Sequence, residues 1–406
     1  MNNTKKASRL IKLESDYGAH NYHPLPVVIA KGKGVYLWDI NGKKHLDFLS
    51  AYSAVNQGHC HPDIVKAMTK QAKKLALTSR AFYNDSLGEY ENYITDYFGY
   101  DKILPMNTGA EAVETAMKLC RKWGYKKKKI PEDKAKIIAC EGNFHGRTIS
   151  IISMSSDPDA RNDYGPYTPG IELIPYNNIP ALAKALEDSN VAGFLAEPIQ
   201  GEAGVIVPDK GYLRAAAELC SNANVLFMAD EVQTGIARTG KLLACDHEKV
   251  RADVLILGKA LSGGMYPISA VLADDEVMLC IKPNEHGSTF GGNPLAARIA
   301  IAALEVVRKE KLAQKANTLG DIFRKELKKI KSPRIQEIRG KGLLNAIVIK
   351  PIKGKTAWHV CLALRENGLL AKPTHEHIIR LAPPLVITKK QILKAAKIIR
   401  KSLKDI

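Results

Sequence analysis

The residue types best suited to chemistry in this 406-residue chain are a lysine and a carboxylate that each follow an apolar run of strand length. Residues 254–257 lead through a glycine into Lys259, and residues 225–229 lead into Asp230. A lysine at the mouth of an apolar strand is partly desolvated, which lowers its pKa and frees the amine as a nucleophile. An electron-sink cofactor of the pyridoxal type needs such a lysine to form a Schiff base and a carboxylate to keep its pyridinium nitrogen protonated. Carboxylates often end strands, so this pair alone does not decide the chemistry.

Two glycine-containing segments could bind a phosphate. Asn107, Thr108 and Gly109 open a segment of helical periodicity, and the N-terminus of a helix with a glycine at its mouth attracts anions. The loop 286–294 offers the hydroxyls of Ser288 and Thr289 before another helix. An ordinary capped helix and a flexible connector are the alternatives. Neither a Walker A pattern nor Gly-x-Gly-x-x-Gly is present, which disfavours ATPases and dinucleotide enzymes.

Other segments offer rings and charges at strand ends. Phe144 could lie flat against a cofactor ring, and Arg147 could bind a carboxylate through both of its terminal nitrogens. Residues 197–202 place the carboxylates of Glu197 and Glu202 on one loop. Arg380 stands in the apolar run 378–381, and a half-buried arginine needs an anionic partner, such as Glu202 or a substrate carboxylate.

The elements that must position these residues alternate along the centre of the chain. We expect strands at 136–140, 191–196, 225–229, 254–257 and 268–273, with helices at 180–187 and 211–223 between them. This alternation predicts an α/β fold with a mostly parallel central sheet. Active residues gather at the carboxyl ends of such strands, where Glu197, Asp230 and Lys259 stand.

The pattern of expected strands and helices divides the chain into three parts. Residues 1–52 form an N-terminal segment, with a β-hairpin of 35–39 and 45–48 around Asn41 and Gly42. Residues 53–299 form the large domain. Residues 300–406 form a smaller α+β domain, in which we expect a long helical stretch over 294–330, strands at 343–349 and 378–381, and an amphipathic helix at the end.

Composition narrows the class of protein. The chain is 45% hydrophobic and 25% charged, which is ordinary for a globular protein. Its net charge of +18 could attract a nucleic acid, but the basic stretches read better as solvated helix faces, so we expect no nucleic-acid partner. No apolar run approaches the roughly 20 residues that span a bilayer, and no secretory signal is evident, so we expect no membrane partner and a cytoplasmic location.

Histidines and cysteines do not point to a metal. The seven cysteines are scattered and include no Cys-x-x-Cys, which indicates reduced thiols rather than disulfides or structural zinc. His59, Cys60, His61, His375 and His377 match no usual zinc spacing, so we expect no metal site.

Taken together, these segments resemble the class III pyridoxal-phosphate-dependent aminotransferases and, within that class, the ornithine δ-aminotransferases. The resemblance runs from about Tyr17 to the last helix. It rests on the segments 17–26, 52–59, 107–109, 197–204, 229–235, 257–261, 286–294, 371–375 and on Arg380. It implies a fold type I transferase with pyridoxal 5'-phosphate as cofactor.

The resemblance also implies roles for the cofactor-binding residues. Lys259 would hold the cofactor covalently and move the proton, and Asp230 would pair with the pyridine nitrogen. Gln233 would contact the ring hydroxyl, and Phe144 would stack on the ring. Gly109 and Ala110 would hold the phosphate, joined by Thr289 from a neighbouring subunit, which implies a homodimer with a shared active site. Further assembly of dimers stays open.

The substrates implied are ornithine and 2-oxoglutarate. Arg147 would bind the α-carboxylate of ornithine, Tyr22 its α-amino group, and Tyr52 would line the pocket. Glu202 would mask Arg380 while ornithine is bound and release it when 2-oxoglutarate enters. Ornithine would become glutamate 5-semialdehyde, which cyclises to pyrroline-5-carboxylate, in either proline biosynthesis or arginine metabolism.

One residue departs from the family pattern. His145 stands where animal ornithine aminotransferases carry tryptophan, whereas histidine is common there in acetylornithine aminotransferases. An acetylornithine or 4-aminobutyrate aminotransferase on the same scaffold is therefore the alternative, although Tyr22 and Tyr52 favour ornithine. A basic nucleic-acid-binding module with a vestigial enzyme fold is the distant alternative.

Overall fold

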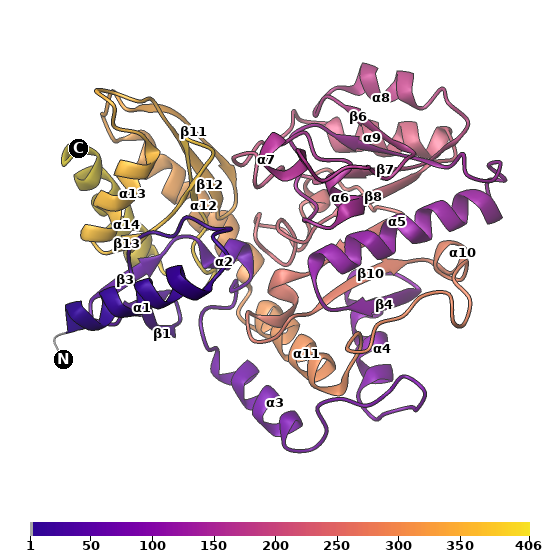
Figure 1. The fold of residues 1–406 in the computed structure, drawn as a ribbon, viewed down its shortest axis with the longest axis horizontal. Coiled ribbons are helices and arrows are strands. Elements are labelled where there is room, and N and C mark those ends of the chain that lie inside the picture. Colours follow the sequence, from indigo (N-terminus) through magenta and orange to yellow (C-terminus); the bar gives the residue numbers. More distant parts are fainter. Residues whose placement is uncertain (1–2) are drawn as a thin grey trace.

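A seven-stranded sheet forms the core of the larger of two lobes, on the right in Figure 1, in a computed structural model that describes residues 3–406. In spatial order its strands are β4 (Lys102–Met106), β10 (Ser269–Ala273), β9 (Val254–Leu257), β8 (Leu226–Asp230), β7 (Val191–Ala196), β5 (Lys136–Cys140) and β6 (Ile171–Ile174). Only β10 runs antiparallel to its neighbours among these paired strands. The predicted α/β class with a mostly parallel sheet is confirmed.

Helices cover both faces of this sheet because its strands are apolar on both sides. Ile137 packs with α5 (Gly109–Lys126) on one face, and its neighbour Ile138 packs with α8 (Ile179–Ala185) and α9 (Tyr212–Asn222) on the other. Successive side chains of a strand point to opposite faces, so a strand between two helical layers is apolar throughout. The burial of every residue of β7, β8 and β9 follows from this arrangement.

The sheet brings three predicted residues to one edge. β7, β8 and β9 are adjacent and parallel. Glu197 follows β7, Asp230 ends β8, and Lys259 comes two residues after β9. These side chains therefore meet at the carboxyl ends of neighbouring strands, where parallel sheets place their ligands.

The C-terminal part is built on a second sheet, which is antiparallel. Its strands are β11 (Ile335–Lys341), β12 (Leu344–Ile349), β15 (Ile378–Leu381) and β14 (Pro373–Thr374). They pack against α12 (Leu312–Lys328) and α13 (Ala357–Glu366), and α14 (Lys389–Lys404) packs on these two helices. The sequence did not predict β11. The single helical stretch expected over 294–330 is wrong, because α11 (Pro294–Lys309) ends before Lys311, which has a left-handed φ of 52°.

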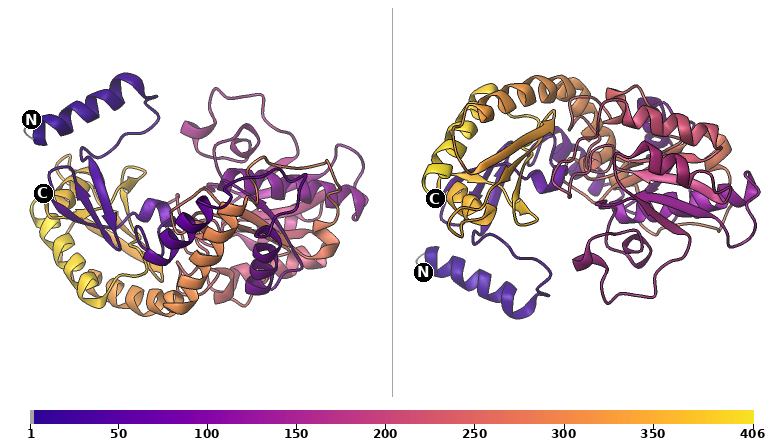
Figure 2. Two further views of the ribbon diagram at one scale, coloured as in Figure 1. Left: turned by 90° about the horizontal axis from the view of Figure 1, so that it is seen from below. Right: turned by 90° about the horizontal axis from the view of Figure 1, so that it is seen from above.

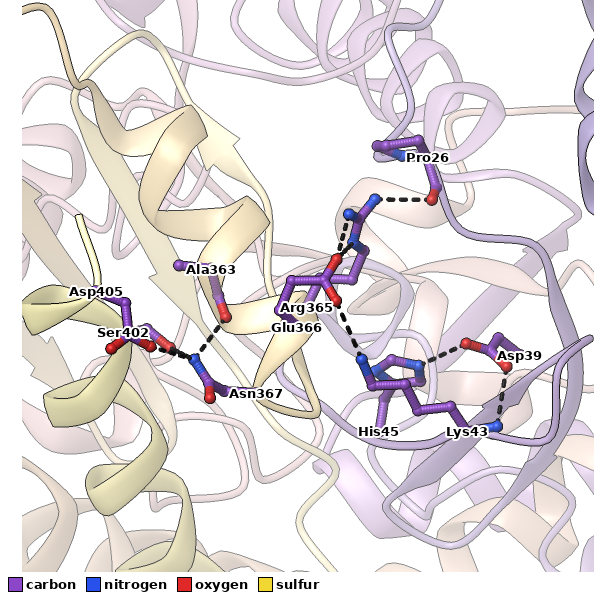
Figure 3. Close-up of polar contacts among 10 residues, drawn as sticks. All are labelled: Pro26, Asp39, Lys43, His45, Ala363, Arg365, Glu366, Asn367, Ser402 and Asp405. Atoms are coloured by element: carbon purple, nitrogen blue, oxygen red, sulfur yellow. Dashed lines mark hydrogen bonds and ion pairs between the residues drawn. The ribbon is translucent and has the colours of Figure 1, made fainter. Parts of the chain in front are cut away.

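The N-terminal strands join the C-terminal part in a third sheet. β1 (Ile29–Lys33), β2 (Tyr36–Asp39) and β3 (Lys44–Asp47) are antiparallel, which confirms the predicted hairpin, and β13 (Leu369–Leu370) pairs with β3 in parallel. Side chains reinforce this junction (Figure 3): Lys43 forms an ion pair with Glu366 at 3.4 Å, and Arg365 donates to the carbonyl of Pro26 at 2.8 Å. The predicted boundaries after residues 52 and 299 stay a prediction, although the second falls inside α11.

The remaining helices surround these sheets. They are α2 (Ser50–Ser53), α3 (Pro62–Ala72), α4 (Leu87–Phe98), α6 (Ile149–Ile152), α7 (Pro158–Arg161), α10 (Asp275–Met278) and two 3-10 turns, Cys245–His247 and Lys259–Ser262. The first helix, α1 (Asn3–Tyr17), stands off from the body of the molecule in both views of Figure 2. Within residues 3–406, no helix is long and apolar enough to cross a membrane.

Candidate active site

Lys259 occupies an unusual backbone position at the end of the central sheet. It opens the 3-10 turn after β9 with a φ of 43°, in the left-handed region that few residues other than glycine adopt. Burial lowers the pKa of its amine, and the charges of Glu202 and Asp230 only partly oppose this effect. A lysine with a depressed pKa has more free amine near neutral pH, as a nucleophile requires.

Asp230 is held by His145, which the sequence marked only as a departure from the family pattern. The Nδ1 atom of His145 lies 2.7 Å from Asp230 Oδ2, while Asp230 Oδ1 accepts from the backbone N–H of Val232 at 3.0 Å. Asp230 and His145 are each 4% exposed. Burial acts to lower the pKa of His145, but the hydrogen bond and charge of Asp230 outweigh it, so the pKa is raised. The pair is therefore a buried carboxylate whose histidine partner holds its proton more tightly than a free imidazole does.

Glu197 orients the loop that contains Phe144. Its Oε1 accepts from the backbone N–H of Phe144 at 2.8 Å, and its Oε2 accepts from that of Gly201 at 3.2 Å. Burial raises the pKa of Glu197 to about 7, against the opposing charge of His145. The Phe144 ring is thus positioned through its own backbone rather than by packing alone.

The N-terminus of α5 and the lysine face the same space. Asn107, Thr108, Gly109 and Lys259 all line one hollow of about 370 Å³. Thr108 caps the helix by accepting from the N–H of Glu111 at 3.2 Å, and the Glu111 carboxylate accepts from the N–H of Thr108 at 2.8 Å. The capping box leaves the first-turn N–H groups of Gly109 and Ala110 without helical partners, as at any helix start. An anion and a carbonyl could therefore be bound together here.

A largely buried ion pair lies close enough to Lys259 for both of its charges to act on the pKa of the lysine. Arg380, in β15, donates from Nη1 to Glu202 Oε1 at 2.5 Å, and the same oxygen accepts from Gln233 Nε2 at 3.3 Å. The positive charge of Arg380 outweighs the burial of Glu202 and lowers the pKa of its carboxyl group. The guanidinium carbon of Arg380 lies 4.9 Å from the centre of the Tyr52 ring, a cation–π distance.

Three predicted residues lie at the periphery of a single chain. Tyr22 is 68% exposed, with Lys372 Nζ 5.6 Å from the centre of its ring. Arg147 is exposed, with its guanidinium carbon 5.6 Å from the centre of the Phe144 ring. Thr289 is exposed and lines a separate hollow of about 570 Å³ with Ser79. Within one chain, Thr289 does not line the hollow of Lys259 and Gly109.

Comparison with known proteins decides the family. The class-III aminotransferase family model matches residues 17–403. The chain belongs to the class III aminotransferases. Enzymes of this class use pyridoxal 5'-phosphate, and a related ornithine aminotransferase structure from Toxoplasma gondii is described with this cofactor at its active site.

Individual relatives of this aminotransferase are similar over nearly their whole length. A mitochondrial ornithine aminotransferase of Rattus norvegicus is 62% identical over 394 residues, covering 97% of this chain and 90% of the rat protein. An ornithine aminotransferase of Schizosaccharomyces pombe is 58% identical, covering 100% of this chain and 95% of its own.

Solved structures of class III aminotransferases superpose closely on this one. The ornithine aminotransferase of Toxoplasma gondii has a TM-score of 0.97 at 50% identity, covering 98% of this chain and 95% of its own. An acetylornithine aminotransferase of Elizabethkingia anophelis has a TM-score of 0.90 at 59% identity, covering 98% and 99%.

The residues of this aminotransferase fit pyridoxal phosphate. A partly desolvated lysine, a first helical turn and a buried carboxylate are the three features that the aldehyde, the phosphate and the ring nitrogen require. Lys259 and the start of α5 line one hollow, and the charge of Asp230 acts to raise the pKa of Lys259, against the larger effect of burial. Gly109 leaves little room for a larger residue, because a Cβ there would lie 3.0 Å from Val232 Cγ1 and that side chain would have to shift.

Proposed function

We propose that this chain is an ornithine δ-aminotransferase. It transfers the δ-amino group of L-ornithine to 2-oxoglutarate, and the products are glutamate and glutamate 5-semialdehyde, which cyclises to pyrroline-5-carboxylate. The high identity to ornithine aminotransferases from a mammal and a fungus over almost the entire chain supports this assignment.

Pyridoxal phosphate supplies an aldehyde that takes up an amino group and a ring that stabilises negative charge at the reacting carbon. Lys259 would hold the cofactor and move a proton between the reacting carbons, which its lowered pKa favours. Asp230 would keep the ring nitrogen protonated. Gln233 would donate to the ring hydroxyl, and Phe144 would pack against the ring.

The first turn of α5 binds the phosphate through the N–H groups of Gly109 and Ala110. Thr289 contributes from a second copy of the chain, because within one chain it lines a different hollow from Gly109. We therefore propose a homodimer in which each active site includes residues of both copies.

The ornithine end of the pocket would be formed by three side chains. Arg147 binds the α-carboxylate, Tyr22 accepts a hydrogen bond from the α-amino group, and Tyr52 closes the pocket over Arg380. Binding the α-carboxylate and the α-amino group at this end of the pocket directs the δ-amine toward Lys259, an orientation effect.

The observation that supports a site for both substrates is the ion pair of Glu202 with Arg380 at 2.5 Å. While the pair is closed, the arginine is neutralised and the pocket accepts a cationic amine donor. When 2-oxoglutarate enters, Arg380 leaves Glu202 and binds the α-carboxylate, while Arg147 binds the distal one. One pocket thereby serves two substrates of opposite charge in a ping-pong sequence.

Acetylornithine aminotransfer is the second candidate, because a structure described with that activity is 59% identical over 98% of this chain. His145, common in such enzymes, favours the same alternative. Acylation of the α-amino group removes the positive charge, so a pocket with Tyr22 as an acceptor should prefer the free amine.

An absorbance spectrum of the purified holoenzyme tests these assignments. Ornithine alone, without 2-oxoglutarate, should bleach the visible band of the lysine-bound cofactor and yield the cyclic product. Bleaching by acetylornithine or 4-aminobutyrate, but not by ornithine, would keep the class and overturn the substrate. The rat relative is described as mitochondrial, and a cytoplasmic location stays a prediction for this chain.

A further inference from the structure

The turn that presents Tyr52 has a backbone conformation that its sequence does not favour. Ser50, Ala51, Tyr52 and Ser53 have φ values of 51°, 46°, 60° and 75°, and none of them is glycine. A left-handed turn of L-residues is sterically unfavourable at every position, and such conformations persist only where the surroundings enforce them.

The carboxylate of Asp47 stands at the entrance to this turn. Its Oδ1 accepts from the backbone N–H groups of Leu49 and Ser50, both at 2.9 Å. The residue is 3% exposed, so these are buried charge-assisted hydrogen bonds, which are about twice as strong as neutral ones. Asp47 thereby fixes the direction in which the chain leaves β3 and enters the left-handed turn.

The imidazole of His59 in turn holds the Asp47 carboxylate in place. Its Nε2 lies 2.7 Å from Asp47 Oδ2, on the side of the carboxylate that the turn does not use. The backbone of His59 is anchored by two hydrogen bonds with Gly34, at 2.8 and 2.9 Å. Its ring lies against Gly32, where a Cβ would approach the His59 Cβ to 3.0 Å. The imidazole is therefore held by the N-terminal sheet and transmits that position to the carboxylate.

The other end of the turn reaches the substrate pocket. The backbone N–H of Tyr52 donates to Leu49 at 3.0 Å, and the Tyr52 ring covers the guanidinium of Arg380 at 4.9 Å. Since Leu49 is itself held by Asp47, a chain of contacts runs from His59 through Asp47 to the aromatic ring.

We propose that Asp47 and His59 are a positioning pair that sets the place of Tyr52 and, through it, the selectivity of the pocket for the α-carbon end of ornithine. This inference rests on the proposed function, in which Tyr52 lines that end of the pocket. Neither residue touches the substrate, so their effect must pass through Tyr52.

A double-mutant cycle on the holoenzyme tests the proposal. The variants are Asp47→Ala, Tyr52→Ala and both together, and the measurement is kcat/KM for ornithine in the first half-reaction. We expect Asp47→Ala to lower this value by on the order of 10- to 100-fold, because small misplacements of orienting groups have effects of this size. In the Tyr52→Ala background the same substitution should change it by less than about 2-fold, because coupled residues are not additive.

Asp39→Ala is the matched control. Asp39 is 8% exposed, accepts from two backbone N–H groups at 2.9 Å and lies 3.1 Å from a histidine, His45, but it borders a different turn of the same sheet (Figure 3). Asp39→Ala should lower the melting temperature much as Asp47→Ala does, yet change kcat/KM for ornithine by less than about 2-fold. The cofactor absorbance band should be unchanged in both variants.

Three outcomes separate the possibilities. Equal losses from Asp47→Ala with and without Tyr52, or an equal kinetic loss from Asp39→Ala, would overturn the positioning role. If Tyr52→Ala alone leaves ornithine kinetics unchanged, the assignment of Tyr52 in the proposed function fails instead. Should Asp47→Ala not fold, His59→Asn takes its place in the cycle, because it keeps both backbone contacts of Asp47. This variant should lower kcat/KM for ornithine by roughly 3- to 10-fold, and the loss should again depend on the presence of Tyr52.

Discussion

Arg380 and Glu202 form an ion pair in which the arginine side chain is 6% exposed and the glutamate side chain 24%. Truncating one partner of such a pair leaves the other charge without compensation, so we expect changes to this pair to alter which substrate charges the site accepts.

The first prediction concerns that charge. In Glu202→Gln, Arg380 loses its anionic partner and stays available for a substrate carboxylate. The ratio of kcat/KM for 2-oxoglutarate to that for ornithine should rise by on the order of 10-fold, the size of one charged hydrogen bond. Separate half-reaction kinetics measure it, with the exposed Glu218→Gln as control. An unchanged ratio would mean that Glu202 does not mask Arg380.

The second prediction concerns Tyr22. Tyr22→Phe removes one hydroxyl, and ornithine kcat/KM should fall by about 5- to 10-fold, in line with a hydrogen bond of roughly 1 kcal/mol. Kinetics with 2-oxoglutarate should stay the same, because it has no α-amino group. Tyr17→Phe is the matched control, since Tyr17 is 85% exposed in the same N-terminal segment. Equal losses for both substrates would argue against a contact with the α-amino group.

The third prediction is a pH dependence of stability. The folded-state pKa of His145 is raised above 6.5 by Asp230, so the folded chain binds a proton there more tightly than the unfolded chain does. The stabilisation is fully present below pH 6.5 and is lost as pH rises through the folded pKa. In cofactor-free protein, His145→Asn should therefore lower the melting temperature most at pH 5.5 to 6 and progressively less in alkaline buffer. A difference that is constant with pH would show that the pair does not titrate in this way.

The fourth prediction compares two helical glycines. A Cβ at Gly320 in α12 would lie 1.8 Å from the carbonyl oxygen of Gly342, whereas one at Gly88 in α4 would meet nothing within 4 Å. Gly320→Ala should destabilise the fold by about 3 kcal/mol, because backbone on both sides must move. Gly88→Ala should be neutral or stabilise it by up to about 1 kcal/mol, because alanine favours helix. Urea unfolding measures both, and similar values would contradict the close approach of α12 to residue 342.

The sequence was most informative where one local pattern determines one element. The alternation of buried strands with amphipathic helices predicted the central sheet, and the place of Lys259 after its strand followed from that. β11 was missed because Ile335–Lys341 is largely polar and only partly buried, so it has no apolar run to detect.

Other features depend on partners that the sequence does not place. The contact of His145 with Asp230 joins the ends of β5 and β8, which β7 separates in the sheet, so no spacing along the chain reveals it. The left-handed turn at Ser50–Ser53 contains no glycine, and the Asp47 carboxylate that accepts from the N–H groups at its start is itself held by His59, a contact that the local sequence does not reveal. Helical periodicity likewise could not locate the break at Lys311, because its signal continues on both sides.

The parallel pairing of β3 with β13 has a consequence for biosynthesis. The strand that leads to Tyr52 leaves the ribosome long before its partner, because Lys43 and Glu366, which close the same junction, are 323 positions apart. Contacts of such long range form late and slow folding. The hairpin of β2 and β3 must therefore wait, with one edge unpaired, until β13 has been made. An unpaired edge is open to wrong pairing, and the turn that presents Tyr52 next to β3 is completed only when this long-range contact forms.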